Sequence, residues 1–401
     1  MKVHIHRGQN QIGGSIIEVS SEQTRLMFDI GINLNECETV SVPKIDGVFA
    51  GKRNCDAVFI SHYHADHMGL VSYLLPGIPI YMGEKAFQMY RASAEYRNLK
   101  TAIEPLFIRD GQKIQIGDIT VTPLCCDHSA YDSYMFVIEN RERKILYTGD
   151  FRANGRMNFS GLMERIPKAD VLITEGTTLS RKQNRKNIEE EQLEDIAVNF
   201  LKGYSGPAFM MMSAMNIDRL ITAYHVAQRT GRILMEDVYT ANIASQAGPG
   251  VPVPDRTKGV RVFSTGGDKQ YAYLQKYGNH KIGKAGIAKL PFLMTIRQSM
   301  EHYLDKLSEI VPFENGVLFY GMWKGYLEQP ELHNFIEHMK GKGVRVHILH
   351  TSGHADEATL DELICHVSPE ILIPVHTENE KWFERYEEAY YVVIEKNEII
   401  V

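Results

Sequence analysis

Three imidazoles and one carboxylate lie within six residues at His62, His64, Asp66 and His67, directly after the apolar run AVFI (57–60). Because alternate side chains of an extended segment share a face, His62 and His64 can bind one ion. A helix is expected to follow His67, and as the chain turns into it, Asp66 and His67 would swing toward a neighbouring position. The segment therefore predicts two adjacent metal sites with ligands that suit zinc, or manganese where carboxylates contribute. The alternative is a solvated histidine-rich loop.

Other candidate residues stand at or just beyond the ends of apolar, strand-like runs. They are Asp29, His62, His128, Asp150, Glu175, His354 and His376. If those strands lie side by side, their ends would gather these polar side chains at one edge of a sandwich. A single Asp after a strand is usually a turn or cap residue, and a single His is usually a core residue. Together with the metal-binding segment, the set favours a functional site.

The first part of the chain is rich in short strands. Apolar or alternating runs predict strands at 15–19, 25–29, 57–60, 78–82, 119–126, 134–139, 144–148 and 171–174. Residues 84–97 have the spacing of an amphipathic helix. The expected fold class is α/β with largely antiparallel sheets in this part.

The middle of the chain has a different pattern. A strand at 207–212, a helix at 216–231 and a strand at 232–237 make a βαβ unit, which implies a parallel sheet. A Gly- and Pro-rich loop is expected at 247–267, followed by a helix at 297–310 and a strand at 316–320. A strand, a helix and a strand return from about residue 344. We therefore predict one sandwich domain, 1–177 and 343–401, interrupted by a small α/β domain at 178–342.

Composition restricts the class of protein. The 401 residues carry 44 Lys and Arg against 50 Asp and Glu, a net charge of -6. No window approaches the roughly 18 apolar residues of a membrane span, and a cytoplasmic protein is expected. The five cysteines are scattered without a CxxC pair, so neither a disulfide framework nor a cysteine zinc site fits. The acidity argues against an indiscriminate DNA coat but leaves room for a local basic groove.

The motifs resemble those of a known family. Asp29, SHYHADH (61–67), His128 and YTGD (147–150) are similar, in order, to the motifs of the metallo-β-lactamase fold. Glu175 in TEGT, His354 in TSGHA and His376 in IPVHTE resemble the three extra motifs of the β-CASP nucleases, which include ribonuclease J. The resemblance covers essentially the whole chain. It implies an αββα sandwich with an inserted α/β β-CASP domain between Glu175 and His354.

The resemblance also implies a role for each motif residue. His62, His64 and His128 would hold one metal ion, Asp66, His67 and His376 a second, and Asp150 would bridge both. Asp29 would support the site without binding metal. His354 would contact the scissile phosphate or protonate the leaving oxygen, oriented by Glu175. Asp66, Glu175, His354 and Asp29 are thus the expected catalytic set.

Substrate-binding residues are expected at two strand-to-helix turns. Ser352 and Gly353, taken to open a helix, would offer backbone N–H groups to a phosphate, although a plain N-cap region fits as well. Ser213 and Arg219 occupy a similar turn, and by the resemblance would help to hold RNA phosphates. The basic residues Arg181, Lys182, Arg185 and Lys186 are candidates for an RNA path, or for a solvated charged face.

The leading functional hypothesis is a ribonuclease that cuts single-stranded RNA with two divalent ions, as an endonuclease, a 5′-to-3′ exonuclease or both. His376 favours RNA over DNA, because DNA-acting members of the resembling group typically have an apolar residue there. The alternatives are a metallo-hydrolase of small esters, lactones or thioesters, and a non-catalytic RNA-binding scaffold. The chain ends about 25 residues after His376, so we expect the C-terminal domain of full-length ribonuclease J to be missing. A homodimer remains possible.

Overall fold

The computed structural model describes residues 1–34, 40–99, 101, 103–180, 186–394 and 398–401. Two compact units make up the chain. The sandwich unit comprises residues 1–153, 157–187 and 353–401, and the parallel-sheet unit comprises residues 154–156 and 188–352. The inserted domain expected at 178–342 stays a prediction, because these units are defined by contacts alone.

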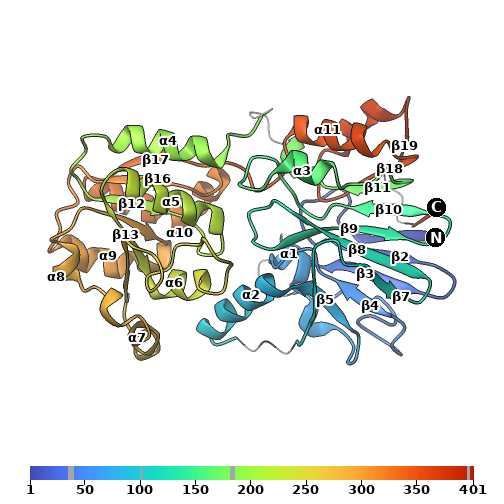
Figure 1. Ribbon diagram of the computed structural model, residues 1–401, viewed down its shortest axis with the longest axis horizontal. Helices are drawn as coiled ribbons and strands as arrows, with labels where there is room; N and C mark the ends of the chain where they lie inside the picture. Colours follow the sequence, from blue (N-terminus) through green and yellow to red (C-terminus); the bar gives the residue numbers. More distant parts are fainter. Residues whose placement is uncertain (35–39, 100, 102, 181–185, 395–397) are drawn as a thin grey trace. The chain divides into compact units, whose positions relative to one another are not determined.

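Two seven-stranded sheets form the sandwich unit (Figure 1). The first has the order β20-β1-β2-β3-β4-β5-β6, with bounds Glu398–Ile400, Lys2–Arg7, Ile16–Ser20, Arg25–Ile30, Ala57–Phe59, Ile80–Gly83 and Leu106–Ile108. The second has the order β19-β18-β11-β10-β9-β8-β7, with bounds Tyr391–Val392, Ile371–Pro374, Val171–Thr174, Lys144–Tyr147, Ser133–Glu139, Ile119–Cys126 and Ile114–Ile116.

The expectation of largely antiparallel sheets is wrong for this unit, because both sheets are mixed. β1, β2 and β3 pair antiparallel, whereas β3, β4 and β5 pair parallel. In the second sheet β8, β9 and β10 pair antiparallel, but β10, β11 and β18 pair parallel. Short hairpin turns allow the first kind of pairing, and crossovers through helices or loops impose the second. The parallel strands end at one edge of each sheet, where the polar candidates follow them.

Apolar side chains between the two sheets make the core. The rings of Phe28 and Phe59 from the first sheet and Phe136 from the second have centroids 5.4–5.7 Å apart. Helices α3 (Phe159–Met163) and α11 (Glu357–Val367) cover the outer face of the second sheet, since Leu360 and Leu363 share a buried cluster with Leu172. Helices α1 (Ala65–Met68) and α2 (Glu84–Tyr96) lie beside β3 and β5 of the first sheet. The layers are those of an αββα sandwich, as expected.

A six-stranded sheet forms the centre of the other unit, and all of its pairings are parallel. Its order is β14-β13-β15-β12-β16-β17, with bounds Val260–Phe263, Ile233–Asp237, Phe292–Ile296, Ala208–Met211, Val317–Tyr320 and Arg345–Ile348. Its helices are α4 to α10, with bounds Glu190–Leu201, Ile217–Arg229, Val238–Ala244, Asp268–Gln275, Lys284–Ile287, Glu301–Ser308 and Pro330–Gly341. The predicted βαβ unit corresponds to β12, α5 and β13.

Two local expectations are wrong. The segment 247–267, expected to be a loop, contains the edge strand β14, whose alternating Val260 and Val262 are fully buried beside β13. The helix expected after His67 is instead a single turn, α1, that contains Asp66 and His67. Gly69 and Leu70 end it, and the chain continues in short turns.

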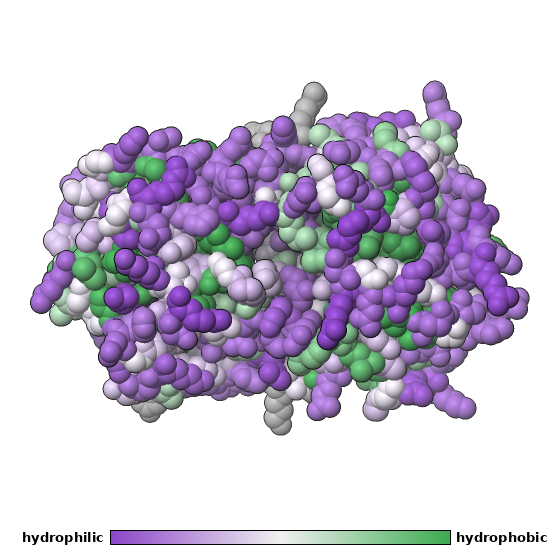
Figure 2. Space-filling model, in the orientation of Figure 1, coloured by the Kyte–Doolittle hydropathy of each residue, from purple (hydrophilic) through white to green (hydrophobic). Residues whose placement is uncertain are grey.

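Polar residues cover most of the visible surface of both units (Figure 2). Among the described residues, no helix is long and apolar enough to cross a membrane.

Candidate metal centre

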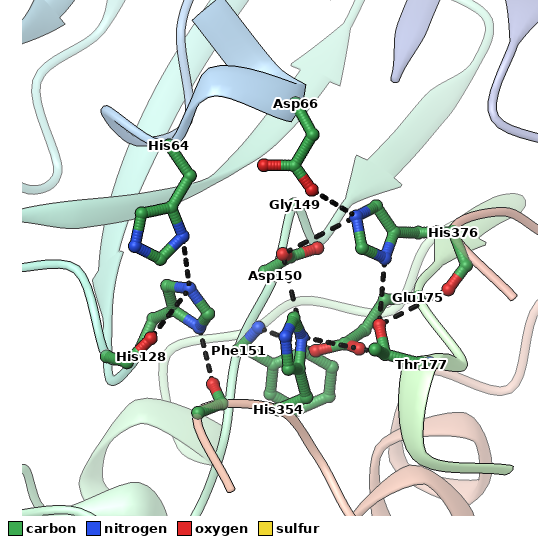
Figure 3. A network of polar contacts seen from close by, with 12 residues as sticks. His64, Asp66, His128, Gly149, Asp150, Phe151, Glu175, Thr177, His354 and His376 are labelled. Carbon is green, nitrogen blue, oxygen red and sulfur yellow. Dashed lines mark hydrogen bonds and ion pairs between the residues drawn. The ribbon is translucent and has the colours of Figure 1, made fainter. Parts of the chain in front are cut away.

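All the expected metal ligands lie in the sandwich unit and converge on one site. Figure 3 shows His64, Asp66, His128, Asp150 and His376 of this set. They come from loops at strand ends: His62 and His64 follow β4, His128 follows β8, Asp150 follows β10 and His376 follows β18. The ligand atoms of His62, His64 and His128 lie within 4.8 Å of one another, as do those of Asp66, His67 and His376. The structure thus brings the predicted ligands together as two neighbouring groups of three.

The nitrogen atoms of the first group are spaced for one ion. His64 Nδ1 lies 3.1 Å from His62 Nε2 and 3.3 Å from His128 Nε2. Three imidazoles that bind one zinc ion tetrahedrally at about 2.0–2.1 Å place their nitrogens roughly 3.3 Å apart.

Asp150 stands between the two groups. Its Oδ2 lies 3.2 Å from His67 Nε2, 3.8 Å from His376 Nε2 and 3.9 Å from His62 Nε2. Its Oδ1 is buried and has no hydrogen-bond partner among the described residues. The same holds for His67 Nε2. Buried polar atoms are rarely left unpaired, so two such atoms aimed into one cluster of His and Asp fit a divalent ion.

The other ring nitrogens are held by acceptors that fix each tautomer. His128 Nδ1 donates to the carbonyl oxygen of Gly353, and His67 Nδ1 donates to Asp29 Oδ2 at 2.8 Å. The Thr177 hydroxyl donates to the carbonyl oxygen of His376, so its oxygen accepts from His376 Nδ1 at 2.8 Å. Each of these bonds leaves a lone pair on Nε2, which is the atom that faces the cluster.

The protonation states of the first group and of Asp66 suit metal ligands. Although burial opposes it, the neighbouring carboxylates, Asp150 foremost, raise the pKa of both His67 and His376. Burial, and then the neighbouring imidazoles, hold the pKa of His62 and His128 well below the usual value. Burial also lowers the pKa of His64 to about 4. The pKa of Asp66 is lowered, because the charges of His67 and His376 outweigh the opposing effect of burial. The first group therefore consists of neutral imidazoles, and Asp66 is an ionised carboxylate.

Asp29 is the hub behind the metal ligands and is fully buried on β3. Its carboxylate accepts from the Ser61 N–H, the Ser61 hydroxyl, His67 Nδ1 and the Tyr147 hydroxyl, all at 2.7–2.8 Å. Its backbone has φ +56°, a left-handed conformation that Asp tolerates better than most residues. Asp29 thus ties the loop after β4 to β10 and orients the His67 ring.

Glu175 and His354 form a pair beside Asp150. Glu175 Oε1 accepts from the Phe151 N–H (3.0 Å) and the Ala355 N–H (3.4 Å), and Oε2 accepts from the Thr177 N–H (3.2 Å). Oε2 also lies 3.2 Å from His354 Nδ1, and that nitrogen is 3.5 Å from Asp150 Oδ2. Because three backbone groups fix Glu175, it can hold the His354 ring in one orientation at the edge of the metal cluster.

Three supporting residues were missed by the sequence analysis. Ser61, Tyr147 and Thr177 hydrogen-bond Asp29 or His376, and each sits inside a motif whose other members were singled out. Their position next to a ligand was the available signal, since ligands commonly hydrogen-bond to neighbouring groups.

Two of the residues expected to bind substrate do not form the helix start expected of them. Ser352 and Gly353 do not open a helix, because α11 begins at Glu357 with Asp356 as its cap. Gly353 offers its carbonyl oxygen to His128, and the Ala355 N–H is used by Glu175. Their role in phosphate binding stays a prediction. Ser213 is exposed, and so is Lys186, while Arg181, Lys182 and Arg185 lie outside the described residues.

The prediction that Arg219 binds substrate is wrong. Its side chain is fully buried in the parallel-sheet unit. The guanidinium pairs with Glu190, at 3.1 Å and 3.3 Å, and donates to the carbonyl oxygens of Gly321 and Leu349, at 2.8 Å and 2.9 Å. Four of the five N–H donors are used inside the protein and the group is buried, so Arg219 joins α5 to α4 and to the loops after β16 and β17.

The Arg219→Met variant should be destabilised by about 3–5 kcal/mol, because the buried carboxylate of Glu190 would lose its guanidinium partner. Urea unfolding would measure this. The matched control is Arg229→Met on the same helix, which breaks a surface pair with Asp195 and should cost no more than about 1 kcal/mol. The double change Arg219→Met/Glu190→Leu should regain much of the loss. Equal effects of the two single changes would contradict the structural role.

Comparison with known proteins supports this description. The model of the β-lactamase superfamily domain matches residues 41–232, and that of the Zn-dependent metallo-hydrolase RNA specificity domain matches residues 342–392. A protein of unknown function from Enterococcus faecalis has the same fold, with a TM-score of 0.84 over 100% of this chain and 99% of its own, at 19% identity.

Curated relatives match at low identity. Ribonuclease J of Sinorhizobium meliloti is 20% identical over 88% of this chain and 64% of its own length. The RNase J-like protein of Methanocaldococcus jannaschii is 27% identical over 59% of this chain and 57% of its own. Subunit 3 of the cleavage and polyadenylation specificity factor of Dictyostelium discoideum is 25% identical over 54% of this chain and 31% of its own. The matches therefore cover only 31% to 64% of the lengths of these relatives. In its motifs, its fold and the two matched family models, the chain is similar to the metallo-β-lactamase proteins and, among them, to the ribonuclease J-like proteins.

Proposed function

We propose that this protein is a metal-dependent phosphodiesterase that hydrolyses RNA. The observation that carries the proposal is one buried cluster in which Asp150 lies between two groups of three ligands and 3.5 Å from His354. Relatives named ribonuclease J support an RNA substrate, as does a matched RNA specificity domain that contains both His354 and His376.

Two divalent ions fit the donor set. His62, His64 and His128 would hold the first, Asp66, His67 and His376 the second, and Asp150 both. The five imidazoles of this set favour zinc. The two carboxylates, Asp66 and Asp150, leave manganese as the alternative. When bound, such ions supply a water of lowered pKa and positive charge that stabilises a phosphate during in-line displacement.

The chain's own residues complete the chemistry. His354 lies beside the cluster with its Nδ1 3.2 Å from Glu175, so Glu175 fixes the direction of the ring. A protonated His354 can donate to the leaving oxygen of a cleaved phosphodiester, which is general acid catalysis. Asp29 keeps the His67 ring in place from behind. Asp66 contributes an ionised carboxylate opposite His376, at 3.2 Å.

The test is digestion of a 5′-end-labelled single-stranded RNA, and of the matching DNA, with zinc or manganese added. The His64→Ala/Asp66→Ala variant is the control. Metal-dependent loss of full-length RNA that the variant fails to produce is expected, and the product lengths distinguish mononucleotide release from internal cuts. If metal binds but neither polymer is cut, while small esters are hydrolysed, the proposal is wrong. A cytoplasmic location and a homodimer stay predictions.

A further inference from the structure

A strongly basic segment lies in the parallel-sheet unit, which contains none of the residues assigned to the metal centre. Residues 258–289, here called the basic arm, contain seven Lys and Arg and one Asp, whereas the whole chain has a net charge of -6. The basic arm runs from β14 through α7 to α8, and its helix α7 projects from the body of its unit (Figure 1). Lys281 bridges back to Val262, so the arm closes on the edge strand of the sheet.

Most of the positive charges of the basic arm have no ion-pair partner among the described residues. The ammonium groups of five lysines form no ion pair with any described residue: Lys258, Lys276, Lys281, Lys284 and Lys289. Lys281 donates to the amide oxygen of Gln275, and Lys276 lies 4.6 Å over the ring of Tyr273. Uncharged partners hold these side chains in place but leave their charge available to an anion.

An exposed aromatic ring accompanies the charges. Tyr271 on α7 is 62% exposed, more than any other described aromatic side chain. It is flanked along the chain by Lys269 and Lys276, both exposed. Within the described part of the arm no other large hydrophobic side chain is exposed. An exposed aromatic ring on a basic segment suits a polymer that offers a base and a phosphate at each step, because bases stack on rings and phosphates attract cations.

A membrane surface fits less well. A helix that lies in the interface buries a broad apolar face of Leu, Phe or Trp. The basic arm instead presents one tyrosine, since Tyr277 and Ile287 are buried against the unit. We propose that the basic arm is a docking surface for single-stranded RNA, separate from the metal centre. This rests on the proposed function, because it assumes that RNA is the substrate.

Binding is measured by fluorescence anisotropy of a labelled oligouridylate RNA with the full chain in EDTA, so that no RNA is cut. The arm variant is Lys276→Gln/Lys281→Gln/Lys289→Gln. Its matched control is Lys113→Gln/Lys202→Gln/Lys306→Gln, which removes three exposed lysines that form no ion pair with a described residue. We expect about tenfold or greater weakening in the arm variant alone. The slope of log affinity against log salt should fall by about 2, since each lost phosphate contact on a single strand contributes about 0.7.

Tyr271→Ala tests the stacking contact by itself and should weaken binding by about 5- to 100-fold without changing the salt slope. The substitutions are at the surface, so thermal unfolding should change little. If the arm and control variants bind RNA alike while the wild type cuts RNA, the arm proposal is wrong and the proposed function stands. If the wild type with metal neither binds nor cuts RNA, both are wrong. If the arm variant loses only binding to phosphatidylserine vesicles, the surface is a membrane site and the proposal is wrong.

Discussion

Asp150→Asn should leave a folded protein that has lost metal and cuts RNA at least about a thousandfold more slowly. Asp150 Oδ2 lies within 3.9 Å of the ring nitrogens of His62, His67 and His376, and Oδ1 is buried without a hydrogen-bond partner among the described residues. An amide of the same shape removes the negative charge that both ions would share. Charge stabilisation by bound metal is worth several kcal/mol in the transition state, and about 1.4 kcal/mol corresponds to tenfold in rate.

Two measurements check this result: metal content per chain by elemental analysis, and the rate of cleavage of a labelled RNA. The control is Asp132→Asn in the same unit, whose carboxylate accepts from the N–H groups of Lys85 and Ala86 at the start of α2. Asn also caps helices, so this variant should keep both its metal and its activity. An Asp150→Asn protein that retains its metal and its rate would contradict the role of Asp150 as the shared ligand.

The clustering of these side chains could be predicted from the sequence because each belongs to a short motif or a strand end. The alternate spacing of His62 and His64 predicts that both face the same way, and their ligand atoms lie within 4.8 Å of each other. His128, Asp150 and His376 each follow a strand of the second sheet by two or three residues. Strand ends at a common edge bring together residues more than 200 positions apart. This part of the site depends on the spacing within each motif and on the rule that neighbouring strands end at a common edge of the sheet.

What the sequence could not predict depends on partners from distant elements. Arg219 stands at the start of a helix, a position that suggests a phosphate contact. Its guanidinium instead forms an ion pair with Glu190 of the preceding helix. Nothing near Arg219 in the sequence indicates that pairing. β14 is flanked by Gly and Pro, which suggest a loop, yet β13 supplies its hydrogen-bonding partner. The mixed pairing of the sheets likewise depends on the connections between strands. The apolar runs predict where the strands lie but not whether neighbouring strands run parallel or antiparallel.

Gly31→Ala should disrupt the metal centre although Gly31 binds nothing there. A Cβ atom at Gly31 would lie 1.6 Å from the carbonyl oxygen of Asp66 and 2.8 Å from the nitrogen of His67. These are backbone atoms, and they cannot move alone: the Asp66 carbonyl accepts from Ser15, and the Ala65 carbonyl accepts from Ile32, both at 3.0 Å. Alanine must therefore displace the turn that carries two ligands.

A shift of about 1 Å in catalytic geometry can cost about a hundredfold in rate, and that is the loss expected for Gly31→Ala, together with reduced metal content. The control is Gly341→Ala in α10, where an added Cβ meets nothing within 4 Å. That change should stabilise the protein by up to about 1 kcal/mol, because alanine favours a helix more than glycine does, and should leave the rate unaltered. Equal metal content and equal rates in the two variants would contradict this prediction. They would mean that the close contact between Gly31 and the turn is not needed to position Asp66 and His67.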